Sequence, residues 1–372
     1  MNNTELQTPA PKKRYLSVDI VRGFAMAFVV GGVTLVMDFA NLLPWNDLAD
    51  FIITQWTHAH WDGIRLGETF TLLVFISGMS VALHGKSTGK LEKKTMKKLL
   101  LRTLQLIVLG IIYNGLFNLD FANMRYCSVL FRIGGSVALA SIIFYKTTTQ
   151  RARILWVTGI LTVYAVLSLV LVAPDAAGAS PLTMEGNFGC WLDRTLLGAH
   201  CYDPLYDPEG IVGTLAATST ALIGAIVGGF ITDERYSDNK RILVIVGVAI
   251  AMCVVAYLLR GIIPVNKKLW SSTYVLMLTG VSMLIFAAFY CIVEKWKFTF
   301  GLKWLISLGR NSIAAYFVHR IFDFTSASEF FLGGLCRYLP TYMTKPLIDI
   351  GAFVILVGIF CFLDKKKIYF KV

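Results

Sequence analysis

The sequence predicts an all-α, polytopic bundle of membrane helices. Of its 372 residues, 56% are hydrophobic and only 16% are charged, whereas about a quarter of the residues in a soluble domain are charged. Apolar runs of about 20 residues, the length that crosses a bilayer, recur along the chain. We predict ten spans, near residues 19–42, 66–84, 98–116, 127–145, 154–173, 210–231, 242–259, 273–293, 304–320 and 346–363.

The lysines and arginines predict how these spans are oriented. Positive residues are enriched in cytoplasmic loops. With both termini in the cytoplasm, the segments on that side carry 22 Lys and Arg and the opposite side carries nine. Residues 1–16 then form a cytoplasmic tail. The same basic loops, facing anionic membrane lipid, account for the net charge of +12, so no nucleic-acid partner is expected.

The chain forms a single transmembrane domain, residues 1–372, with no separate soluble domain. Its longest loop, 174–209, is predicted outside and is rich in turn residues and aromatics. Loops of this length in compact proteins are usually functional or disordered, and the aromatics argue against disorder. Cys190 and Cys201 share this loop. An oxidising compartment would allow a disulfide between them, and two free thiols are the equal alternative.

Five polar residues fall within or at the ends of predicted spans. "SVDIVRGF" puts Asp19 and Arg22 three residues apart on one helix face, either as a structural ion pair or as an anchor for an anionic cofactor on the cytoplasmic side. Arg132, Arg310 and Asn311 add polar groups to other spans. Ionisable groups in a membrane are costly and usually functional, and arginine forks suit phosphate. Together these residues predict a polar cavity through the bundle.

Residues 57–70, "THAHWDGIRLGETF", place His58 and His60 just before the second span. They follow an amphipathic stretch, 45–57, that suits an interfacial helix. Three roles are open for the histidines: an ordinary interfacial side chain, a metal ligand, or a general base or acyl acceptor, because imidazole titrates near neutral pH. No third metal ligand is identifiable, so no metal is assigned. Glu68 or Asp62 could orient the imidazole.

A series of short motifs carries a family resemblance. The stretches are "SVDIVRGF" (17–24), "HAHWDGI" (58–64), "LLVFISGMS" (72–80), "IIYNG" (111–115), "MRYCSVLFRIG" (124–134), "YDPEGIVGTL" (206–215), "NKKLWSSTYVL" (266–276) and "GRNSIAAY" (309–316). In their identity and order they resemble the heparan-α-glucosaminide N-acetyltransferase family, its bacterial members in particular. "YDPEG" and "NKKLW" are the most specific of them.

The resemblance implies a membrane acyltransferase. It would take an acetyl group from cytoplasmic acetyl-CoA and transfer it to an amino sugar of the glucosamine type on the periplasmic side of a bacterial inner membrane. His58 matches the catalytic histidine, as general base or acyl acceptor. The resemblance also allows a homodimer. The other expected site residues are, for the cofactor, Asp19, Arg22, Arg132, Arg310 and Asn311, and for the substrate, Trp61, Glu68, Asn114, Arg125, Asp207, Glu209, Lys267, Lys268 and Trp270.

Some of these residues have an ordinary alternative role. Lys267 and Lys268 break the positive-inside trend and either face the cavity or extend to lipid headgroups. Asp207 and Glu209 either hold a sugar hydroxyl or ammonium or cap the helix that follows, because acids near a helix N-terminus are favourable.

Two departures from the family pattern leave other functions open. Val33 stands where the family often has a polar residue, and Phe131 replaces a glutamine before Arg132. The protein could therefore use another acceptor or acyl donor, or be a degenerate scaffold. A transporter of a small sugar or related solute is the competing class, because ten spans with polar residues near the middle also suit a carrier. A carrier would ignore acetyl-CoA.

Overall fold

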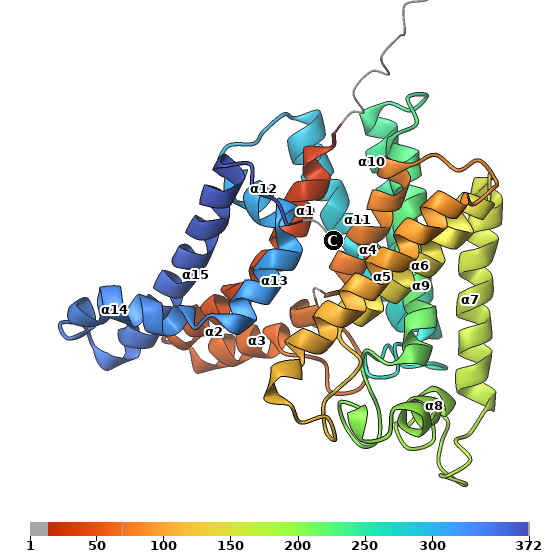
Figure 1. Ribbon diagram of the computed structural model, residues 1–372, viewed down its shortest axis with the longest axis horizontal. Helices are drawn as coiled ribbons and strands as arrows, with labels where there is room; N and C mark the ends of the chain where they lie inside the picture. The colour runs from red at the N-terminus through yellow and green to blue at the C-terminus, as the bar shows by residue number, and fades with distance from the viewer. Residues whose placement is uncertain (1–13, 69, 371–372) are drawn as a thin grey trace, which may run out of the picture.

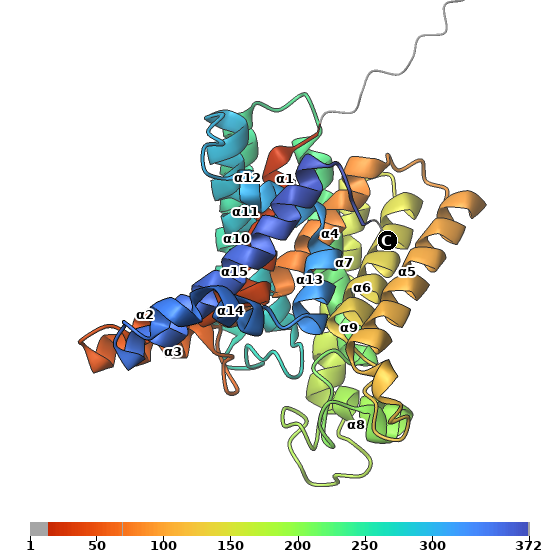
Figure 2. The ribbon, with the colours of Figure 1, turned by 60° about the vertical axis from the view of Figure 1, so that its left-hand side comes forward.

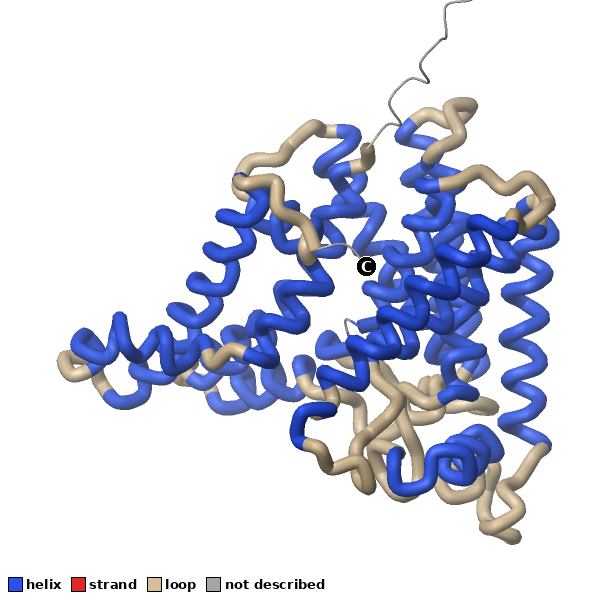
Figure 3. Tube along the Cα trace, viewed as in Figure 1, coloured by secondary structure: helices blue, strands red, loops and turns tan. Residues whose placement is uncertain are grey.

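The computed structural model describes residues 14–68 and 70–370 and confirms the all-α class (Figures 1 and 3). Those ranges contain no β-strand, only an isolated bridge between Val172 and Asn187. The elements are α1 Leu16–Ala27, η1 Phe28–Gly32, α2 Val33–Asn41, α3 Asn46–Trp56, η2 Leu66–Glu68, α4 Phe70–His84, α5 Lys93–Tyr113, η3 Leu116–Asn118, α6 Val129–Lys146, α7 Gln150–Val170, α8 Phe188–Leu197, η4 Gly198–His200, α9 Ile211–Ile231, α10 Asp238–Leu259, α11 Ser272–Tyr290, η5 Cys291–Lys295, α12 Lys303–Arg310, α13 Ser312–Ile321, α14 Phe324–Cys336 and α15 Thr341–Lys365.

Eight of the ten predicted spans are helical segments long and apolar enough to cross a membrane, so the protein is a multi-pass membrane protein. The predicted span 98–116 falls mostly in α5, and three positive residues, Lys97, Lys98 and Arg102, lie within it or next to it. The predicted span 304–320 is divided into α12 and α13. For these two segments, crossing of the bilayer stays a prediction. Of the predicted cytoplasmic tail, residues 1–13 lie outside the described residues.

The first span is bent in its middle. A π-helical turn, η1, separates α1 from α2, and within it Gly31 has a φ of 141°. Residues with a side chain rarely adopt this conformation, so glycine is required at the bend. The bend turns α2 away from α1 and toward α3, so that the chain reaches His58 through a helix pair at one end of the bundle (Figure 1).

The second break, between α12 and α13, falls at Asn311, whose backbone has a φ of −116° and a ψ of 27° and is not helical. The Asn311 amide donates to the carbonyl of Ile368 (3.2 Å), and its carbonyl oxygen accepts from the N–H of Phe370 (3.0 Å). Asn311 therefore ties the segment after α15 to the bundle, and both ends of its amide are used in doing so.

The long loops gather at one end of the bundle. In Figure 3 the loops around α8 lie opposite the end where α1 begins. α4 and α9 pack against each other in the centre, while α7, α10 and α15 lie at the periphery with much of their apolar surface exposed. Figure 2 shows α2, α3 and α14 extending to one side. Helix α3 confirms the helix predicted over 45–57, whereas α14 has no counterpart among the predicted elements.

Candidate active site

The segment that carries His58 is fixed by its own charged residues. Arg65 donates to the hydroxyl of Thr57 (2.5 Å) and to the carbonyl of His58 (3.0 Å). Asp62 pairs with Arg260 (2.5 Å). These contacts hold residues 57–65 as a compact loop. The carboxylate of Asp62, one of the two candidates for orienting the imidazole, is thus bonded to Arg260 and not to His58.

The same loop is docked on a second one, more than 200 residues later in the chain. The N–H of Val265 donates to Asp62 (2.7 Å), and the N–H of Gly63 donates to the carbonyl of Val265 (3.0 Å). The chain then turns tightly, because Asn266 accepts from the N–H of Leu269 (2.9 Å). This turn presents Lys267 to the first loop.

His58 and Lys267 meet at this junction. The Lys267 ammonium nitrogen lies 3.1 Å from Nδ1 and 3.2 Å from Nε2 of the imidazole. Partial burial and, second, the positive charge of Lys267 lower the pKa of His58 to about 4. The imidazole is therefore neutral at physiological pH and can act as a nucleophile or accept a proton.

Lys267 itself lies in a mixed electrostatic environment. Burial lowers the pKa of its ammonium, while the carboxylates of Glu68 and Glu209 oppose that effect and the charge of Arg132 adds to it. Four of the predicted site residues therefore act on one another around His58. They come from four separate elements or loops of the fold.

Three buried side chains of this cluster have polar atoms without a hydrogen-bond partner among the described residues. They are Oε2 of Glu68, Nδ2 of Asn266, and Nε and Nη1 of Arg132. The other carboxylate oxygen of Glu68 accepts from the N–H of Ala59, at 3.4 Å. Buried polar groups are nearly always hydrogen-bonded. A group of them with free bonding capacity indicates a place for water or for a polar ligand.

Arg132 is held by the stacking of its guanidinium on an aromatic ring and by one hydrogen bond to a backbone carbonyl. Its guanidinium carbon lies 4.0 Å from the centre of the Trp270 ring, and Nη2 donates to the carbonyl of Gly210 (3.3 Å). A Cβ at Gly213 would lie 2.6 Å from that nitrogen, so glycine makes room for the guanidinium. Arg132 thus joins the residues predicted for the substrate, and it does not lie with the other four residues predicted for the cofactor.

Arg125, Asp207 and Glu209 form a second, closely paired group. Arg125 makes two hydrogen bonds to Asp207, of 3.0 and 2.5 Å, and also pairs with Glu209. Asp207 additionally accepts from the N–H groups of Tyr202 and Glu209, both at 2.9 Å. Asn114 donates to the carbonyl of Arg125 (3.0 Å). These contacts stabilise the chain before α9 and leave Asp207 little capacity for a ligand.

The cap of α9 comes from a residue that the sequence analysis did not single out. Asp193, in α8, accepts from the N–H groups of Ile211 (2.8 Å) and Val212 (3.3 Å), so the hydrogen-bonded cap comes from Asp193 and not from Asp207 or Glu209. Burial raises the pKa of Asp193 to about 6 despite these bonds. No local pattern links Asp193 to a helix that begins 18 residues later.

The remaining outer residues pack around this region. Trp61 lies against a small cluster of Cys190, Tyr206 and Leu269, and the Lys268 ammonium lies 5.5 Å from the centre of the Tyr206 ring. Cys190 and Cys201 are both free thiols, which decides between the two alternatives for this pair. No group of three or more His, Cys, Asp or Glu in the described ranges is placed to hold a metal ion.

A separate charged cluster lies at the other end of the bundle. Asp19 pairs with Arg14 (2.6 Å) and lies 3.8 Å from Arg22 and 4.0 Å from Arg310. Arg310 also pairs with Asp364 (2.9 Å). Three arginines against two aspartates leave an excess of one positive charge, which suits an anion. The structure thus brings Asp19, Arg22 and Arg310 together, while the side chain of Asn311 is used in holding the C-terminal segment.

Comparison with known proteins gives two relatives of the same name. The human protein named heparan-alpha-glucosaminide N-acetyltransferase is 25% identical over 419 aligned residues, which cover 96% of this chain. The mouse protein of that name is 25% identical over 371 residues and 83% of this chain. The chain is similar to the heparan-α-glucosaminide N-acetyltransferases.

This similarity confirms the resemblance derived from the motifs. The chain spans 60% of the length of the human heparan-α-glucosaminide N-acetyltransferase and 54% of that of the mouse protein. No family model matches the chain.

Proposed function

We propose that the protein is a transmembrane acetyltransferase that moves an acetyl group from acetyl-CoA on the cytoplasmic side to an amino sugar on the opposite side of a bacterial inner membrane. The observation that carries the proposal is the contact of His58 with Lys267, whose ammonium also interacts with the charges of Glu68 and Arg132, two buried side chains with polar atoms that lack a hydrogen-bond partner among the described residues. The names of the similar proteins support the reaction class.

The cluster around Asp19 is suited to the phosphates of the donor. Arg22 donates to Ser80 (2.7 Å) and stays partly exposed, so its guanidinium can bind an anion in addition to Asp19. Acetyl-CoA supplies a thioester whose carbonyl carbon is the electrophile. Helix α9, with 21 residues, spans roughly 30 Å, and the thioester has to reach the His58 end across a similar distance.

The acceptor amine has two routes to the acetyl group. In direct transfer, His58 takes a proton from the amine, the nitrogen attacks the thioester carbon, and the C–S bond breaks to release the CoA thiolate. In the covalent route, the imidazole attacks the thioester first, the thiolate leaves, and the amine then displaces His58 from the acetyl group. Both routes start from the neutral ring, which the lowered pKa of His58 supplies, so the pKa does not choose between them.

The buried polar atoms are suited to the acceptor. Arg132 Nε and Nη1 and the Asn266 amide can donate to sugar hydroxyls, and Glu68 can accept from a hydroxyl or an ammonium group. A site that hydrogen-bonds its substrate in this way strongly rejects analogues that lack the matching groups. We therefore expect glucosamine to be a better acceptor than a simple alkylamine.

The test is release of the CoA thiol by purified protein given acetyl-CoA, with and without glucosamine. Thiol release that depends on the amine supports acetyl transfer. A single stoichiometric burst without amine, together with an acetylated His58 peptide, selects the covalent route. If the protein neither binds acetyl-CoA nor releases thiol but carries glucosamine unchanged across a vesicle membrane, the proposal is wrong and the transporter class replaces it.

A further inference from the structure

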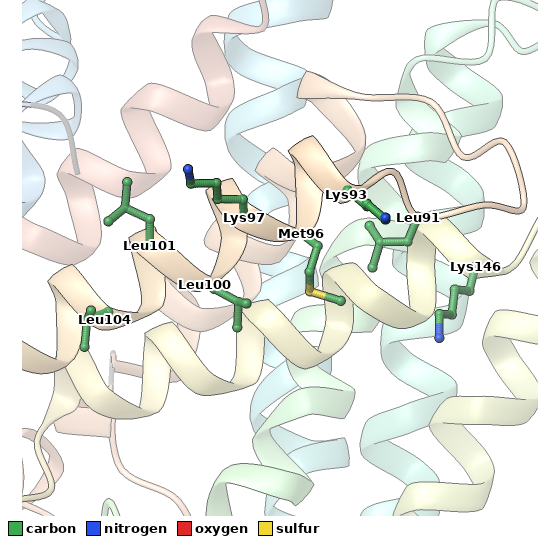
Figure 4. Close-up of a pocket in the computed structure, with 8 residues that line it drawn as sticks. All are labelled: Leu91, Lys93, Met96, Lys97, Leu100, Leu101, Leu104 and Lys146. Carbon is green, nitrogen blue, oxygen red and sulfur yellow. The ribbon is translucent and has the colours of Figure 1, made fainter.

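A groove with apolar and basic walls lies on the outer face of α5, and none of its lining residues belongs to either charged cluster. It has a volume of about 640 Å³ and is lined by residues of α5 and the end of α6 (Figure 4). Three leucines of α5 line one part, and Leu100, Leu101 and Leu104 are 60%, 53% and 57% exposed. α5 packs mainly against α6, so this leucine surface faces outward.

Basic side chains line the other part of the groove. Lys93 and Lys97 lie four residues apart and hence on the same helix face, and Lys146 stands in the last turn of α6. None of the three ammonium groups has an ion-pair partner in the described part of the chain. Residues 85–98 contain six lysines and a single acid, Glu92. The groove therefore has a marked excess of positive charge at one end.

The two parts are arranged in order along the helix axis. From Lys97 to Leu104 the rise is roughly 10 Å, which separates a charged level from an apolar level. In the orientation predicted from the lysines and arginines, the charged level lies at the cytoplasmic surface, where the lipid is anionic. A free anion would use the lysines and leave the leucines unused, whereas an amphiphile with an anionic head matches both parts.

We propose that this groove binds an anionic phospholipid. Its phosphate lies between Lys93, Lys97 and Lys146, and one acyl chain lies along Leu100, Leu101 and Leu104. The site is independent of the acetyltransferase reaction, since none of these residues belongs to either charged cluster. The positive charge of the lysines favours an anionic head group. The exposed leucines favour a ligand with an acyl chain, which a membrane lipid has and a free anion lacks.

The chain offers a matched control for the test. Lys94 and Lys98 lie on the same helix, are as exposed as Lys93 and Lys97, and do not line the groove. The variants Lys93→Gln/Lys97→Gln and Lys94→Gln/Lys98→Gln therefore remove equal charge from the same turns. Native mass spectrometry of the full-length protein in detergent, titrated with phosphatidylglycerol or phosphatidylcholine, measures lipid retention directly.

We expect the wild type to retain phosphatidylglycerol at least several-fold better than phosphatidylcholine. The Lys93→Gln/Lys97→Gln variant should lose most of that preference, and the control variant should keep it. Inorganic phosphate at millimolar concentration should not displace the lipid. Equal loss in the two variants, equal retention of the two lipids, or displacement by phosphate would each overturn the proposal. Thermal unfolding of both variants shows whether either loss comes from misfolding.

Discussion

The two charged clusters of the bundle satisfy their charges in different ways. Around Asp19, each of three arginines reaches a carboxylate. Around His58, the lysine meets an imidazole, and polar atoms of Glu68, Asn266 and Arg132 are buried without a partner among the described residues. Near-complete pairing at the Asp19 end suits a site that stabilises helices, while its one unmatched positive charge and Nε of Arg310, which lacks a hydrogen-bond partner among the described residues, leave capacity for an anion. At the His58 end the free buried atoms belong to three different side chains, and we therefore propose that the acceptor enters and the chemistry occurs there.

Removal of the His58 imidazole should have the largest effect on activity. His58→Ala should lower acetyl transfer by about 10²–10⁴-fold, the usual contribution of a positioned acid–base group. His60→Ala is the matched control, because His60 lies two residues away in the same loop and is exposed like His58. Thiol release measures both. If the two variants lose activity equally, loop structure rather than the His58 imidazole accounts for the loss.

Removal of Arg125 should affect stability more than chemistry. Arg125→Gln leaves Asp207, whose side chain is fully buried, and Glu209 without their cation. Breaking a buried pair from one side costs about 3–5 kcal/mol, so thermal unfolding in detergent should occur at a clearly lower temperature. Arg235→Gln, which breaks an exposed pair with Asp233, should leave the melting temperature nearly unchanged. A normal melting temperature for Arg125→Gln would argue that these carboxylates serve a ligand instead.

The cluster around Asp19 can be tested by acetyl-CoA binding alone. Arg22→Gln should weaken acetyl-CoA affinity by about 10–100-fold, because a charge-assisted hydrogen bond contributes about 1.5–3 kcal/mol. Isothermal titration calorimetry measures the affinity. His58→Ala should bind acetyl-CoA as the wild type does, which separates the two ends. Wild-type affinity in a stably folded Arg22→Gln protein would remove this residue from the donor site.

Replacement of Lys267 should change the pH dependence of the reaction. Its charge and, more strongly, burial hold the pKa of His58 at about 4. Lys267→Met removes the positive charge, so the pKa of His58 should rise toward its ordinary value while the burial effect stays. The acid limb of the kcat/KM profile should therefore move to higher pH, since a larger fraction of His58 is protonated at any given acidic pH. An unchanged limb would mean that another group sets the acid limb.

Local patterns in the sequence predict most of the long helices, but they predict neither α8 nor α14 and none of the contacts between helices. The length of the apolar runs predicts the spans. The predicted orientation also places Arg132 near the outer surface, because the chain runs from outside to inside along the predicted span 127–145 and Arg132 lies near the start of that span. The hydrogen bonds of the Asn311 side chain reach residues more than 50 positions later. The docking of residues 57–65 on Val265 joins loops 200 positions apart. Such contacts leave no periodicity in the chain, and neither does the Asp193 cap.

We propose that donor binding and acetyl transfer occur at opposite ends of the bundle. Proteoliposomes of uniform orientation test this, with labelled acetyl-CoA on the side of the Asp19 cluster and glucosamine on the His58 side. We expect labelled N-acetylglucosamine on the His58 side, free CoA on the other side, and neither product with His58→Ala. Product formed only when both substrates share one side, or glucosamine carried across unchanged without acetyl-CoA, would contradict it.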